Sequence, residues 1–184
     1  MKVKLNPKKY NELLIGCGSR WEKDLWVKGH ETWSNLVALD HNNDHKPHVI
    51  WDLMEMPLPF ADEVFDEIHA YEVLEHTGTQ GDYRFFFTQF SEFYRLLKPG
   101  GIIVGSCPRP NTPSALADPS HSRIVQKENF IFLDQNEYTN RVGKTRFSDF
   151  RNIYKGDFSF EHYHENGDSW YFMLKAVKPS RISI

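Results

Sequence analysis

Cysteine is scarce in this sequence, which contains only Cys17 and Cys107. Two cysteines without a CxxC spacing form neither a disulfide framework nor a cysteine-based metal site, so buried, reduced thiols are expected. Long apolar runs are also missing. No stretch approaches the 18 residues of a membrane span, and the first fourteen residues lack the apolar centre of a signal peptide. These absences predict a soluble, cytoplasmic protein with no membrane partner.

A strong net charge and internal repeats are missing as well. The 22 basic and 25 acidic residues give a formal charge of −3, which provides no electrostatic indication of a nucleic-acid partner. No low-complexity tract or linker interrupts the chain. The 184 residues therefore predict one domain over 1–184, whose core can draw on 40% hydrophobic and 15% aromatic residues.

Short apolar segments bounded by turn residues recur through the first two thirds of the chain. Such runs are typical of strands that are buried on both faces of a parallel sheet. A helix is predicted over 82–97, because Phe86, Phe90, Phe93 and Tyr94 form one apolar stripe and Pro99 follows. The predicted strands cover 13–15, 35–39, 48–51, 65–71 and 102–106.

The C-terminal part of the sequence alternates instead. Segments 158–163 and 169–177 are predicted strands, and Asn166-Gly167 between them predicts a hairpin with a type I′ turn. The expected fold class is α/β: a mostly parallel, seven-stranded sheet that ends in an antiparallel hairpin, with helices on both faces. Segment 108–146 is the least regular. We predict that it forms a lid on the acceptor side of the ligand site at the strand ends, with His121 and Arg123 as its functional residues.

A glycine-rich turn follows the first predicted strand. Gly16 and Gly18 let the backbone approach a ligand closely, and Asp40 at the end of the second strand can accept hydrogen bonds from ribose hydroxyls. The third glycine of the dinucleotide-binding pattern is absent, because Trp21 occupies that position. An NAD-dependent oxidoreductase, whose sheet is parallel throughout, is therefore disfavoured.

Several segments in this order and spacing resemble S-adenosylmethionine-dependent methyltransferases of the Rossmann-like class. The resemblance is greatest to the short branch that has a GCG first motif and a VLEH motif, in which little or no helix follows the first strand. It extends from about Leu13 to Cys107. The segments that carry it are Leu14-Ile15-Gly16-Cys17-Gly18-Ser19, Val37-Ala38-Leu39-Asp40, Trp51-Asp52-Leu53, 56–60, 65–76 and 96–101.

The resemblance implies S-adenosyl-L-methionine as cofactor, with S-adenosyl-L-homocysteine as product. The backbone of the glycine turn would line the methionine half, and acidic residues at strand ends would bind the adenosine half. Tyr71 and Glu72 would border the sulfonium. The implied cofactor residues are Gly16, Cys17, Gly18, Asp40, His41, Asp52, Leu53, Tyr71 and Glu72.

The reaction needs a general base only if the acceptor must lose a proton. The candidates are Glu72, His76 and His121. His41, His45 and His48 lie close together in the sequence, but Pro47 and the preceding asparagines argue against helical spacing, so no metal site is predicted.

Two questions stay open at this level. The chain is either an active methyltransferase or a non-catalytic module of the same fold that binds S-adenosylmethionine or a nucleoside. The acceptor is not identified. The site is expected to be open, or to be completed by a second copy of the chain or a partner subunit.

Overall fold

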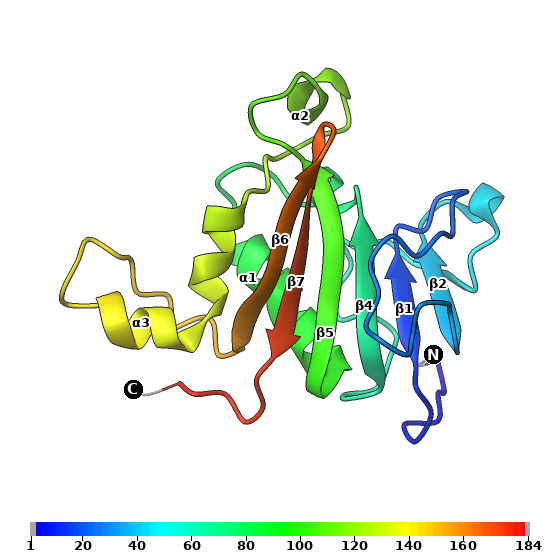
Figure 1. Cartoon of the computed structure of the whole chain (residues 1–184), viewed down its shortest axis with the longest axis horizontal. Coiled ribbons are helices and arrows are strands. Elements are labelled where there is room, and N and C mark those ends of the chain that lie inside the picture. The colour runs from blue at the N-terminus through cyan, green and yellow to red at the C-terminus, as the bar shows by residue number, and fades with distance from the viewer. Residues whose placement is uncertain (1–2, 183–184) are drawn as a thin grey trace.

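Seven strands form a single sheet in the computed structural model, which describes residues 3–182. The strand order is β3-β2-β1-β4-β5-β7-β6 (Figure 1). The first five strands are parallel, and β7 runs antiparallel to both β5 and β6. The predicted fold class is therefore confirmed. The strands are β1 (Glu12–Ile15), β2 (Leu36–Asp40), β3 (Val49–Ile50), β4 (Phe65–Tyr71), β5 (Leu97–Pro108), β6 (Phe158–Asn166) and β7 (Ser169–Ala176).

Helix α1 (Tyr83–Leu96) follows the predicted helix closely. Asp82 caps it by accepting a hydrogen bond from the backbone N–H of Phe85 at 3.0 Å. Phe87, Phe90 and Phe93 are buried against the sheet. The next strand, β5, begins at Leu97 rather than at residue 102, because Leu97 already pairs with Phe65 before a register shift.

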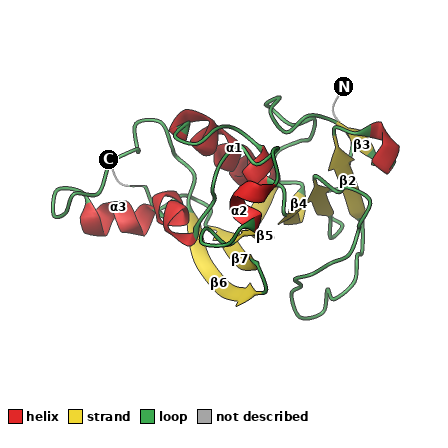
Figure 2. Ribbon diagram, turned by 90° about the horizontal axis from the view of Figure 1, so that it is seen from above, coloured by secondary structure: helices red, strands yellow, loops and turns green. Residues whose placement is uncertain are grey.

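Within residues 3–182, helices cover one face of the sheet only (Figure 2), so the prediction of helices on both faces is wrong. Leu13 and Ile15 belong to the large core under α1, whereas Leu14 points to the opposite face. There the cover within the described residues is the loop between β1 and β2, which contains no helix (Figure 2). Trp21 and Trp33 of this loop pack against Leu14.

A buried ionic cluster holds this loop on the sheet. The Lys23 ammonium group donates to Glu12, to Glu67 Oε2 at 2.8 Å and to the His30 carbonyl at 2.7 Å. Its side chain is 3% exposed, and both carboxylates are fully buried. Glu67 also accepts from Tyr10 at 2.5 Å and contacts His69 at 2.7 Å. An ion-pair network thus attaches the loop to this face of the sheet.

This cluster predicts a loss of stability in acid. Burial raises the pKa of Glu67, but its hydrogen bonds with His69, Lys23 and Tyr10 outweigh burial and lower it to about 2. Burial lowers the pKa of His69 below its usual 6.5. The unfolded chain therefore binds more protons, first below about pH 6.5 at His69 and then below about pH 4.5 at Glu67, so stability falls as the pH falls.

Urea unfolding at pH 7 and pH 4 measures this effect. Between these values the wild type is expected to lose about 1 kcal/mol more than Glu67→Gln, whose side chain does not titrate. Equal losses in the two proteins would contradict the proposed linkage.

The C-terminal hairpin is confirmed, but the predicted type I′ turn is wrong. Asn166 pairs with Ser169, so the two loop residues are Gly167 and Asp168. Among these, only Gly167 has a positive φ, of 58°. A positive φ at the first loop position alone is the pattern of a type II′ turn, which also favours glycine there.

Segment 109–146 leaves the carboxyl end of β5 and crosses to the α1 face (Figure 1). It carries α2 (Ser114–Ala117), the 3-10 helix η3 (Lys127–Leu133) and α3 (Gln135–Arg141). Buried Arg123 fixes it by donating to the Leu74 carbonyl, Thr77 Oγ1 and Gln89 Oε1. Arg123 therefore anchors the segment to the body of the domain. Across residues 3–182, no helix is both long and apolar enough to cross a membrane.

Candidate active site

The turn after β1 has the backbone that its glycines allow. Gly16 and Gly18 have φ values of 57° and 50°, in the left-handed region that other residues rarely adopt. A Cβ at Gly16 would lie 2.2 Å from Val73 Cγ2, whereas one at Gly18 would meet no atom within 4 Å. Gly16 is thus required for packing against the segment after β4, and Gly18 borders open space.

Asp40 at the end of β2 is tied to this turn. Its Oδ2 accepts from the Gly18 N–H at 2.9 Å, and its Oδ1 accepts from the Asn42 N–H at 2.8 Å. Burial raises its pKa, but these two hydrogen bonds and nearby His45 outweigh burial, so the pKa lies below its usual value. Asp40 is therefore a carboxylate beside the glycine turn, and its 5% exposure leaves little of it open to a ligand.

A cavity of about 400 Å³ opens at the carboxyl ends of β1, β4 and β5. It brings together five of the predicted cofactor residues, in the arrangement that parallel strands produce at one edge of a sheet. The predicted residues that line it are Gly16, Cys17, Gly18, Tyr71 and Glu72, with the Cys17 side chain itself buried.

Tyr71 and Glu72 shape the wall that β4 contributes. The Tyr71 hydroxyl lies 2.8 Å from His69 Nδ1 and accepts from the Leu25 N–H at 3.0 Å, which fixes the ring against the β1–β2 loop. Glu72 has a φ of 49°, a conformation that is costly for a residue with a side chain. Its N–H donates to the Ser106 carbonyl at 3.0 Å, which holds this strained backbone at the cavity.

The cavity is surrounded mainly by negative charge. Glu22, Asp24 and Glu72 line it together with one cation, Arg20. Arg20 is already paired with Glu22 at 2.5 Å and with Asp24 at 2.8 Å. The remaining charge favours a ligand with positive charge.

Sequence reasoning missed one lining residue each on β1 and β5, and all those that the β1–β2 loop beyond Gly18 and β7 contribute. The loop carries no strand or helix pattern, so its acidic residues could not be placed. A signal existed for β7: because this strand is antiparallel, its beginning lies at the carboxyl edge. The missed lining residues are Leu14, Ser19, Arg20, Glu22, Asp24, Ser106, Ser169 and Tyr171.

The structure does not bring the remaining predicted cofactor residues into the cavity. Asp52 is exposed and accepts from the Met54 N–H, although Trp51 beside it donates to the Asp40 carbonyl at 2.9 Å. The Leu53 side chain is buried in the core. His41 is 79% exposed, with its Nδ1 3.5 Å from Asp40. These residues follow β2 or β3 in the chain, and none of them lines the cavity.

The predicted bases His76 and His121 lie together in a separate cluster with Glu75. Their rings are 4.6 Å apart, and each Nε2 is 4.0 Å from Glu75 Oε1. Glu75 follows β4 in the 3-10 helix η2 (Leu74–His76), and burial raises its pKa to about 8. Glu72, which lines the cavity, is only three residues before Glu75, so the cluster is close to the cavity in the sequence.

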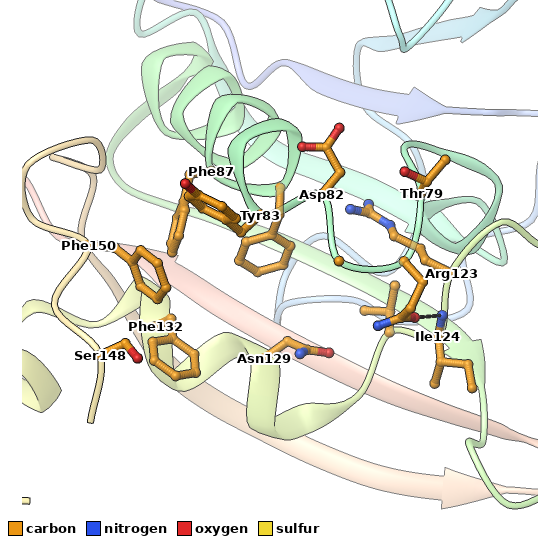
Figure 3. Close-up of a pocket in the computed structure, with 14 residues that line it drawn as sticks. Thr79, Asp82, Tyr83, Phe87, Arg123, Ile124, Asn129, Phe132, Ser148 and Phe150 are labelled. Carbon is orange, nitrogen blue, oxygen red and sulfur yellow. Dashed lines mark hydrogen bonds between the residues drawn. The ribbon is translucent and has the colours of Figure 1, made fainter. Parts of the chain in front are cut away.

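A second, largely apolar pocket of about 250 Å³ lies beside the beginning of α1. Phe87, Phe132 and Phe150 gather at one end, and Thr79 and Arg123 lie at the other (Figure 3). It shares no lining residue with the cavity at the glycine turn. The two sites are therefore distinct.

The chain belongs to a methyltransferase family, because the family model described as "Methyltransferase domain" matches residues 13–105. None of the curated proteins matches it. Solved structures show the same fold at low identity. A SAM-dependent methyltransferase from Archaeoglobus fulgidus is 19% identical with a TM-score of 0.59, and the match covers 92% of this chain and 87% of that one.

Two further structures are similar. A complex from Haloferax volcanii contains the Trm112 methyltransferase activator and a candidate methyltransferase. The matching chain of this complex is 11% identical with a TM-score of 0.58, and the match covers 91% of this chain and 83% of that one. The N-methyltransferase NodS from Bradyrhizobium japonicum WM9, in complex with S-adenosyl-L-homocysteine, is 16% identical with a TM-score of 0.53 over 91% and 78%.

Proposed function

We propose that this chain is an S-adenosylmethionine-dependent methyltransferase whose cofactor binds in the cavity beside Gly16 and Gly18. The observation that carries the proposal is the convergence of the left-handed glycine turn, Tyr71 and Glu72 on one cavity at the carboxyl edge. Membership in the methyltransferase family and a solved neighbour that contains S-adenosyl-L-homocysteine support the choice of cofactor.

The residues fit this cofactor chemically. When bound, S-adenosylmethionine supplies a methyl group on a positively charged sulfur: a nucleophile of the acceptor attacks the methyl carbon, and the sulfur leaves as the neutral thioether of S-adenosylhomocysteine. Gly18 leaves open space beside the turn. The acidic lining of Glu22, Asp24 and Glu72 complements the sulfonium charge. Asp40 and Asp52, with His41 and Leu53 next to them, stand at the outer strand ends, where we propose that the adenosine half binds.

Among the three candidate bases, Glu72 is the one that lines the cavity. We assign it the proposed position beside the sulfonium. Holding the reactants in alignment contributes a large part of the rate in such displacements. Segment 109–146 remains the proposed acceptor lid, because it leaves the sheet at the end of β5 next to Ser106 of the cavity.

Calorimetric titration of the full chain tests the cofactor assignment. S-adenosylmethionine and S-adenosylhomocysteine are expected to bind one site with micromolar affinity, whereas NAD is expected to give no saturable heat. Saturable binding of NAD but not of the two sulfur compounds would refute the proposal. A turnover assay on a panel of oxygen, nitrogen and sulfur acceptors then follows S-adenosylhomocysteine release. Binding without release on any acceptor favours the non-catalytic module.

A charge-specific prediction concerns Glu72→Gln. The substitution keeps the size of the side chain and removes its charge, so affinity for the cationic S-adenosylmethionine should fall about three- to tenfold. Affinity for the uncharged thioether of S-adenosylhomocysteine should change less. Glu161→Gln, on exposed β6 outside the cavity, is the matched control. An equal loss for both ligands would argue against Glu72 beside the sulfonium.

A further inference from the structure

Three side chains converge behind the segment that follows β4, and each presents a hydrogen-bond acceptor. Glu75 and His76 come from η2, and His121 comes from segment 109–146. Their ligand atoms all lie within 4.8 Å of one another. The two parts of the chain are joined by the backbone, since the N–H groups of Ser122 and Arg123 donate to the Glu75 carbonyl at 2.9 Å and 3.3 Å.

The Glu75 carboxylate lacks a partner. Its side chain is 2% exposed, and neither oxygen has a hydrogen-bond partner among the described residues. The neighbouring thiol of Cys107 is a weak donor, and the Nε and Nη2 groups of nearby Arg123 donate to other acceptors. A buried carboxylate without a partner is costly, so the group is neutral unless a cation binds beside it.

Both histidines are held so that Nε2 faces the carboxylate as an acceptor. His121 Nδ1 lies 3.2 Å from the Ala115 carbonyl, which can only accept, so the proton is on Nδ1. His76 Nδ1 lies 3.0 Å from Ser120 Oγ, whose own proton goes to Asp118 Oδ1 at 2.5 Å. Ser120 therefore accepts from His76 Nδ1, which leaves the Nε2 lone pair free.

We propose that Glu75, His76 and His121 bind one divalent transition metal ion of the zinc type. Two imidazoles and one carboxylate form a common three-residue zinc set that leaves a coordination position open. Each Nε2 is 4.0 Å from Glu75 Oε1, whereas bonds of about 2.1 Å place tetrahedral ligand atoms roughly 3.4 Å apart. Small side-chain rotations close this difference.

The arrangement around the histidines is that of a metal site. Metal-bound histidines usually donate their second ring nitrogen to a carbonyl or a carboxylate, which fixes the ring. Here the Ala115 carbonyl does this for His121, and the Ser120–Asp118 pair does it for His76. Glu12, Glu67 and His69 also lie close enough together to bind a metal ion. They do not form an open site, because the Lys23 ammonium group already pairs with both carboxylates.

The site does not depend on the proposed cofactor, so it can be tested separately. The His76 side chain is one third exposed, which gives an ion a route from solvent. The histidines of segment 41–48 form no such set: His48 Nδ1 accepts from the Ala38 N–H, and His41 projects outward.

The test is a titration of the full chain, freed of metal by a chelator, with Co²⁺ followed by its visible absorption and with Zn²⁺ in competition. One Co²⁺ per chain is expected, displaced by Zn²⁺. His121→Ala and Glu75→Gln should weaken Co²⁺ binding at least about 100-fold. Ser120→Ala, an exposed change behind His76, should weaken it roughly tenfold.

The matched control is His162→Ala, which removes an exposed histidine that pairs with His164 on β6. It should leave Co²⁺ binding unchanged. If His121→Ala does not fold by circular dichroism, partly exposed His76→Ala gives the decision instead. Less than half an equivalent of Co²⁺ on the wild type, or equal binding by the wild type and His76→Ala, would overturn the proposal.

Discussion

Lys23→Met is expected to lower the free energy of unfolding by about 3–5 kcal/mol, because it leaves two buried carboxylates without their cation. Glu12 and Glu67 are both fully buried, and Lys23 contacts both. Methionine fills a similar volume, so the loss measures the missing charge rather than a cavity. Urea unfolding at pH 7 measures the change.

Lys28→Met in the same loop is the matched control, since Lys28 is exposed and its loss should change stability by less than about 0.5 kcal/mol. Adding Glu12→Gln and Glu67→Gln to Lys23→Met should restore part of the stability, because the unpaired charges are then gone. A loss below about 1 kcal/mol for Lys23→Met would show that the ion pairs do not hold the loop.

The parts of the fold that the sequence predicts are those with a local period. The stripe of Phe90 and Phe93 predicts α1, and the short apolar runs predict where the strands lie, although β5 begins five residues earlier than predicted. The glycine turn, Tyr71 and Glu72 could also be predicted to meet, because the carboxyl ends of parallel strands share one edge.

The parts that escaped prediction depend on contacts between distant residues. Lys23 looks like an ordinary surface lysine in the sequence, yet it is buried between Glu12 and Glu67. No local pattern marks a loop that replaces a helix. For the same reason the cover of the second sheet face was predicted incorrectly, and the acidic lining from the loop was missed.

The candidate functional residues include both kinds: some that the sequence predicts and some that only distant contacts bring together. His76 and His121 are predicted as separate candidate bases, whereas nothing in the sequence marks Glu75 as the residue that lies 4.0 Å from both. Glu75 stands out because neither of its buried carboxylate oxygens has a hydrogen-bond partner, which depends on the three-dimensional structure and leaves no trace in the sequence. Asp52 and Leu53 are predicted at the cofactor by resemblance, and their position relative to the cavity depends on the path of the chain after the two-residue strand β3.

Gly16→Ala is expected to lower the free energy of unfolding by about 2–5 kcal/mol and to weaken S-adenosylhomocysteine binding at least tenfold. Two costs add: a left-handed backbone with a side chain costs about 1–2 kcal/mol, and overpacking about 1–3 kcal/mol. The new methyl group would lie 2.2 Å from Val73 Cγ2, so either the glycine turn or the segment leading to Glu75 must move. Urea unfolding and calorimetry measure the two effects.

Gly18→Ala separates these costs, because its φ of 50° is similar but its Cβ would meet no atom within 4 Å. It should cost only the backbone term, about 1–2 kcal/mol. Adding Val73→Ala to Gly16→Ala removes the closest contact, at Cγ2, although the Val73 Cβ at 2.9 Å remains. The pair should therefore show a favourable coupling in a double-mutant cycle. Equal losses for Gly16→Ala and Gly18→Ala, with no coupling to Val73, would mean that the turn and the segment after β4 do not pack as described.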